Sequence, residues 1–224
     1  MTGTLVDFAK LAPKNYLLHK ELKKMKWTAG TAGTWTQPET GSWTGICIRV
    51  IDVGTHEKQF KGKIKMVRMS QIVWEIPDQL DSENNPLTIS KSYTASLAEK
   101  ANLRKDLEAW RGRPFTPDEL GGFEVSNIIG KPCLLNLVTV QGQKGERVVV
   151  AGISPLPKGM PAPPKTTYHS RFVYSLDEHD PKVWNQLSER MQDWINRSEE
   201  RQSTPKAIDP AGVASNMTDD EIPF

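Results

Sequence analysis

The chain has 224 residues, of which 37% are hydrophobic and 25% are charged, and its formal net charge is +2. This length suits one domain of ordinary size with extensions. No apolar run approaches the roughly 18–20 residues of a membrane span, and Asp7 and Lys10 interrupt any signal-like pattern at the N-terminus. We therefore predict a soluble, cytoplasmic protein without a membrane partner.

Cysteine and histidine usage indicates neither a disulfide nor a metal centre. Cys47 and Cys133 each lie in an apolar, strand-like run, which favours two reduced and buried thiols. The histidines have no cysteine or histidine partner at the spacing of metal ligands. They are His19, His56, His169 and His179. We expect no metal and no cofactor.

Residues 1–42 predict a basic N-terminal arm, since lysines recur up to residue 26 and Gly, Thr and Pro dominate residues 28–41. A short helix within residues 15–25 would fit its apolar residues.

The first predicted strand covers residues 43–53. Its alternation places Ile46, Ile48 and Val50 on one face. Residues 54–56 then supply a turn.

The next extended run covers residues 60–76, and it alternates as well. The parity opposite to its apolar residues belongs to three lysines, Lys61, Lys63 and Lys65. A run of this length either bends or divides into two strands. Residues 77–87 are polar and contain two prolines and two asparagines, so they predict a loop.

Two helices are predicted next, each with a capping box at its start. The first begins at Ser96 with Glu99 three residues later, and it ends at Gly112. The second is shorter and begins at Thr116, with Glu119 completing the box.

Two further strands are predicted at residues 133–140 and 147–153, joined by a hairpin loop. Residues 154–167 are rich in proline and predict a linker or a surface strap. A last helix begins after Asp180, which caps it, and carries Val183, Leu187, Met191 and Trp194 on one apolar face.

The order of strand, long bent strand, helix, strand and strand is that of an OB-fold barrel, whose helix lies between the third and fourth strands. We therefore predict a mainly β (α+β) fold: a five-stranded OB-fold barrel with a helical insertion, a C-terminal helix and a disordered tail. A small β-sandwich would give a similar pattern. The predicted domains are the basic arm 1–42, the OB domain 43–155, the Pro-rich strap and C-terminal helix 156–200, and the disordered linker and acidic tail 201–224.

OB folds can bind oligonucleotides. A binding face for single-stranded nucleic acid combines basic residues, which contact phosphates, with aromatic rings, which stack on bases. One stretch of the second extended run offers both: Phe60, Lys61, Lys63 and Lys65. Further residues that would extend such a groove are Arg49, Arg68, Lys91 and Tyr93. A solvated strand face explains the lysines equally simply.

Other aromatic and basic residues have more than one interpretation. The parity of Trp74 and Trp110 favours the core, whereas the roles of Trp27, Trp35 and Trp43 stay open. Arg111 and Arg113 fit either phosphate contacts or capping of a helix end.

The last six residues combine three binding features. The three acidic residues Asp219, Asp220 and Glu221 carry a charge of −3, so residues 1–218 carry +5 and the whole chain +2. Such an acidic run is attracted to basic surfaces. Phe224 offers a ring for a pocket and an α-carboxylate for an Arg or Lys at its edge. Pro223 biases Ile222 toward extended conformations. A solubilising tail is the alternative.

This ending resembles the C-terminal peptide of bacterial single-stranded DNA-binding proteins, which finishes in several aspartates and then Ile-Pro-Phe; Glu221 replaces the usual aspartate. The resemblance implies that residues 219–224 dock on replication and repair proteins and compete with DNA for the barrel. Because bacterial members assemble through their barrels, a homo-oligomer is one of the possible states of this chain, and the sequence does not decide it.

The body of the chain has a second resemblance, to phage and prophage single-stranded DNA-binding proteins with an OB fold. The matching segments are residues 92–100, 103–113, 115–116, 130–133 and 51–55, within about residues 40–155. This resemblance implies single-stranded DNA as the ligand and the cytoplasm of a bacterial host as the location. Many members lack the bacterial-type tail, so its presence here is a departure.

Two alternatives belong to other functional classes. A nuclease or ligase is disfavoured because the sequence has no Lys-x-Asp-Gly motif, no Walker loop and no carboxylate cluster with metal spacing, and Asp52 and Asp106 stand apart. We therefore expect no enzymatic activity. An adaptor that captures host replication and repair proteins through the tail, without strong DNA binding, is the other alternative.

Overall fold

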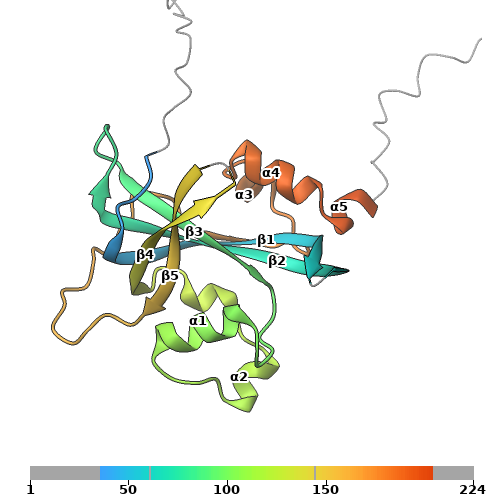
Figure 1. Cartoon of the computed structure of the whole chain (residues 1–224), viewed down its shortest axis with the longest axis horizontal. Coiled ribbons are helices and arrows are strands. Elements are labelled where there is room, and N and C mark those ends of the chain that lie inside the picture. The colour runs from blue at the N-terminus through green and yellow to red at the C-terminus, as the bar shows by residue number, and fades with distance from the viewer. Residues whose placement is uncertain (1–35, 61, 144, 204–224) are drawn as a thin grey trace, which may run out of the picture. The chain divides into compact units, whose positions relative to one another are not determined.

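The computed structural model describes residues 36–60, 62–143 and 145–203. Within them, one six-stranded sheet has the order β3-β2-β1-β4-β5, and β6 adds to β1 in parallel; all other neighbours are antiparallel (Figure 1). The strands are β1 Gly41–Phe60, β2 Lys63–Leu80, β3 Pro86–Thr94, β4 Pro132–Gly142, β5 Gly145–Ser154 and β6 Phe172–Tyr174. The mainly β class predicted from the sequence is confirmed at this level.

Strand β1 is longer and less regular than predicted. It continues through Gly54, where a turn was expected, and its register with β2 shifts between Cys47 and Arg49 and again between Asp52 and Gly54. Each such β-bulge adds one residue to β1 and reverses which residues face which side. The single face predicted for Ile46, Ile48 and Val50 is therefore wrong, because Val50 packs in a different core cluster from Ile48.

The segment between β2 and α1 also differs from the prediction. Strand β2 is one continuous strand, and only residues 81–85 connect it to β3. The loop predicted at residues 77–87 is therefore wrong at both ends. Strand β3 was not identified from the sequence, although Ile89 and Tyr93 alternate with Ser90 and Ser92. Because its alternate residues are polar, this segment looks like a loop in the sequence, and only its pairing with β2 identifies it as a strand.

Helices α1 Asn102–Arg111 and α2 Pro117–Gly121 and the 3-10 turn η2 Val125–Ile128 lie between β3 and β4 in the chain. The capping box at Thr116 is confirmed. The one predicted at Ser96 is wrong: Ser96 Oγ accepts from the N–H of Ala98 in a local turn, and α1 begins only after Ala101. Ser96 thus closes a turn of its own, an alternative that serine readily offers the backbone.

The predicted C-terminal helix is three short helices, α3 Pro181–Trp184, α4 Glu189–Asn196 and α5 Glu199–Ser203. Asp180 caps α3 as expected, accepting from the N–H of Lys182. Ser188 then caps α4, so one apolar face is divided between two helices. The Pro-rich residues 155–171 carry no helix or strand and run as a strap to β6.

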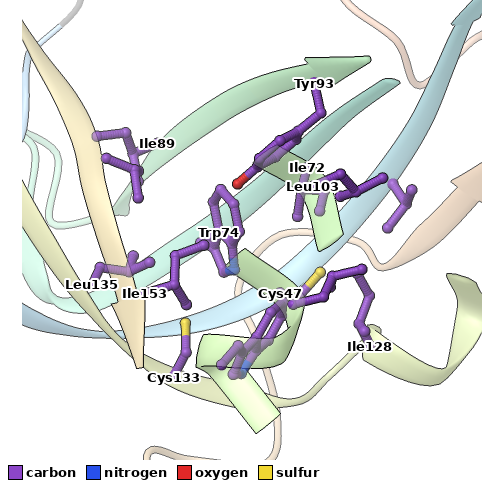
Figure 2. Close-up of a cluster of buried hydrophobic side chains, with 14 of the residues drawn as sticks. Cys47, Ile72, Trp74, Ile89, Tyr93, Leu103, Ile128, Cys133, Leu135 and Ile153 are labelled. Carbon is purple, nitrogen blue, oxygen red and sulfur yellow. The ribbon is translucent and has the colours of Figure 1, made fainter. Parts of the chain in front are cut away.

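Two hydrophobic clusters lie on opposite faces of β1 and β2. The first packs the sheet against α1 on one side, and α3–α5 cover the second on the other side (Figure 1). We call the first side the inner face and the second the outer face. Trp74 has no exposed surface and lies at the centre of the inner cluster, with Cys47, Tyr93 and Leu103 around it (Figure 2). The core positions predicted for Trp74 and Trp110 are confirmed.

Candidate nucleic-acid interface

The β1–β2 hairpin carries three lysines on its outer face. Lys58 lies directly opposite Lys65 in the antiparallel register, and Lys63 lies two residues before Lys65 on β2. Directly paired residues share a face of a sheet, as do alternate residues of one strand. All three side chains are exposed. We call Lys58, Lys63 and Lys65 the hairpin lysines.

The hairpin lysines form no ion pair with any residue that the structure describes. The nearest carboxylate in the sequence, Glu57, lies opposite Met66 and therefore points to the inner face. Like charges directly opposite on two strands destabilise the pair. A polyanion bound here would neutralise this charge.

A row of hydroxyl side chains lines the outer face of β3. Its members pair with odd-numbered residues of β2, which share the face of the hairpin lysines. The row consists of Thr88, Ser90, Ser92 and Thr94. Ser90 and Ser92 are exposed, and Gln71 Nε2 donates to Ser92 Oγ at 3.3 Å. Met69 and Val73 of β2 are buried beneath the C-terminal helices, so the exposed part of this face is the hydroxyl row of β3. At about 3.3 Å per residue, this row extends roughly 20 Å from Thr88 to Thr94.

Arg68, predicted as part of the groove, is neutralised within the protein. Its guanidinium donates to both carboxylate oxygens of Asp52 and, at 2.8 Å, to Asp177. The hydrogen bond to Asp52 is the main reason that the pKa of Arg68 lies above its usual value. The trio joins β1, β2 and the segment after β6, which makes Arg68 a structural residue.

Lys91 and Tyr93 lie on the inner face, away from the hairpin lysines. Lys91 Nζ is 2.6 Å from Asp106 Oδ2, and the Tyr93 hydroxyl donates to the same oxygen at 2.9 Å. Tyr93 is only 3% exposed, and burial followed by the Asp106 charge raises its pKa. A ring buried this deeply offers no face to a base, so the predicted groove does not continue through these two residues.

Arg49 lies on the outer face but is half-buried. Its guanidinium stacks 5.1 Å from the centre of the Phe172 ring, and burial lowers its pKa below the usual value. Arg111 and Arg113 both donate to Glu119, whose pKa falls well below its usual value chiefly through the hydrogen bond from Arg111. These contacts tie the end of α1 to α2, which differs from both roles considered above, phosphate contact and capping of a helix end.

The remaining predicted site residues lie outside what the structure describes. They are Lys61, the side chain of Phe60, and the tail residues Asp219, Asp220, Glu221, Ile222, Pro223 and Phe224. Lys58 was missed from the sequence because the first strand was predicted to end at Val53. Its spacing of two residues from Phe60 could have indicated that the two share a strand face, but only the register of the hairpin shows that Lys58 lies opposite Lys65.

The described residues contain no group of His, Cys, Asp and Glu that could hold a metal ion. None of their helices is both long enough and apolar enough to cross a membrane. Cys47 and Cys133 are free thiols with no exposed surface. The chain matches no known protein-family model and none of the curated proteins.

Proposed function

We propose that the protein is a non-catalytic single-stranded DNA-binding protein that holds the strand from the hairpin lysines along the exposed outer face of β3. The observation that carries this proposal is the set of hairpin lysines, which share one exposed face and form no ion pair with a described residue. Exposed lysines that share one face can contact phosphates and release counterions from the strand. The hydroxyl row of β3 extends the face with neutral hydrogen-bonding groups.

The finer fold proposal is an OB-type barrel that stays open between β3 and β5. The pairing of β1 with both β2 and β4, and the helix between β3 and β4, match the OB connection order. Cα atoms of β3 and β5, the two ends of the sheet path, come within 8 Å of each other. OB folds bind oligonucleotides across strands 2 and 3 and the loop between strands 1 and 2, where the hairpin lysines lie.

The second part of the proposal is recruitment of replication and repair proteins through Asp219–Phe224. Its support is the sequence of these six residues, which join an acidic run to an aromatic C-terminal residue. An acidic run binds basic surfaces, and a terminal carboxylate next to a ring can be captured at the edge of an apolar pocket.

Titration with labelled oligo-dT at several salt concentrations tests DNA binding. We expect single strands to bind more tightly than duplex, with an affinity that falls steeply as salt rises. Replacing Lys58, Lys63 and Lys65 with alanine should weaken binding and flatten the slope of log K against log salt by up to about 0.7 per lysine.

The matched control replaces three exposed lysines elsewhere, Lys100, Lys105 and Lys158, with alanine. It removes the same net charge, so a specific hairpin site predicts a clearly smaller effect. Equal effects of the two triple variants would mean that only net charge matters and would contradict a specific site at the hairpin. A protein that captures partners through its tail yet binds no single strand would be the adaptor.

A further inference from the structure

Tyr168 differs from every other Phe, Trp and Tyr whose side chain the structure describes, because the residue is 64% exposed while the others are buried or half-buried. It lies in the strap that leads to β6. Stacking on a base requires an accessible ring face, so Tyr168 is the described aromatic that already meets this requirement.

The backbone around Tyr168 is fixed by a buried carboxylate. Glu75, in β2, is 2% exposed and accepts from the N–H of Tyr168 at 3.2 Å and from the N–H of His169 at 2.8 Å. His169 Nδ1 lies 2.7 Å from the same carboxylate, and its ring meets the Tyr168 ring edge to face at 5.1 Å. A ring mounted on a fixed backbone loses little conformational freedom on binding.

Glu75 also places Tyr168 at the end of the proposed DNA face. It pairs with Thr88, the first member of the hydroxyl row, whereas the hairpin lysines lie at the opposite end of β2. Lys165 and Arg171 are exposed in the same strap and form no ion pair with a described residue, although the Arg171 guanidinium donates to Thr167 Oγ1 and to the carbonyl of Lys165. An exposed ring in the same strap as two cations without a carboxylate partner among the described residues suits a base flanked by its phosphates.

We propose that Tyr168 is a base-stacking residue, so that one strand runs from the hairpin lysines along β3 to this ring. The inference rests on the proposed function and adds to it that the protein contacts bases as well as the backbone. Stacking tolerates any base, so Tyr168 supplies affinity without sequence specificity.

The experiment compares oligo-dT with an abasic strand of the same length, which keeps the phosphates but has no bases. Tyr168→Ala should weaken oligo-dT binding roughly 5- to 150-fold, as expected for the loss of one stacked base. It should leave binding to the abasic strand unchanged within about twofold. Tyr168→Phe keeps the ring and should bind oligo-dT like the wild type.

The triple alanine variant of the hairpin lysines serves as the reference, because it should weaken binding to both strands. Equal losses for Tyr168→Ala on the two strands would overturn the stacking role and indicate a disturbed strap. No loss on oligo-dT would overturn it while leaving the proposed function intact, since the wild type would still bind. A wild type that binds neither strand would refute the proposed function and the inference with it.

Discussion

Arg68, Lys91 and the hairpin lysines carry the same charge but differ in what neutralises it. Arg68 has two carboxylates within hydrogen-bonding distance and Lys91 has one, while the hairpin lysines have none among the described residues. A cation already paired with a carboxylate has to give up that partner to bind phosphate. Local pairing thus separates structural cations from those free for a ligand.

The two cysteines give a prediction at this scale. Burial raises the pKa of the Cys47 thiol from 9.0 to about 12, and the pKa of Cys133 is raised for the same reason. The thiolate is the reactive form, so both thiols should resist Ellman's reagent in the native protein at pH 8 and react in full in urea. Rapid native labelling of either thiol would contradict this burial.

The raised pKa values of the two thiols also determine how the free energy of unfolding changes with pH. Unfolded thiols ionise near pH 9, whereas the buried thiols stay protonated to higher pH. The unfolded state therefore binds fewer protons above pH 9, so these two residues lower the stability of the native protein as the pH rises further.

Among the elements, β1 contributes to both cores, as β2 does, but β1 carries two bulges. Each bulge shifts the alternation of β1 by one residue, so Cys47 and Val50 both face the inner cluster while Ile48 and Ile51 face the outer one. Beside the second bulge, α5 is held to β1 by Glu200, which accepts from the backbone N–H and the hydroxyl of Thr55. The C-terminal helices thus cover the outer face at a fixed place.

At Gly54, β1 lies close against Ser198 and Leu176 of the C-terminal segment. The φ of Gly54 is +87°, and an added Cβ would lie 2.5 Å from Ser198 Cβ and 2.7 Å from Leu176 Cδ1. Gly54→Ala should therefore lower the free energy of unfolding by about 2–4 kcal/mol, through backbone strain and overpacking together. Urea denaturation measures this change.

Gly62, in the turn of the same hairpin, is the matched control. Its φ is +74°, but no atom of the described residues outside its chain neighbours lies within 4 Å of an added Cβ. Gly62→Ala should cost only the backbone strain, about 1–2 kcal/mol. Equal losses for the two variants would show that the C-terminal segment does not pack closely on Gly54.

At the scale of the whole molecule, the tail and the DNA face carry opposite charges on one chain. A tethered segment has an effective concentration near the millimolar range, so the acidic tail should compete with DNA for the hairpin lysines. Deleting residues 217–224 should leave DNA affinity unchanged or raise it, most visibly at low salt. The same deletion should abolish capture of replication and repair proteins from a bacterial extract.

Deleting Phe224 alone separates these two effects of the tail. Capture should be lost, because both the ring and the correctly placed carboxylate are removed, whereas DNA binding should hardly change because the three acidic side chains remain. Undiminished capture of the same partners by this variant would reduce the tail to a solubilising extension.

Local patterns in the sequence were enough for the mainly β class, the β4–β5 hairpin, the caps at Thr116 and Asp180 and the core positions of Trp74 and Trp110. Each depends on periodicity or on contacts within a few residues, which a sequence displays directly.

Only the tertiary structure decided where β1 bulges, that residues 86–94 form a strand, and which cations are free. Lys58 meets Lys65 through the register of the hairpin, and Arg68 meets Asp177 from more than a hundred residues away. The mounting of Tyr168 on Glu75 likewise spans 93 residues. Pairing over such separations is set by the register of the sheet and by the packing around it, and no local pattern encodes either.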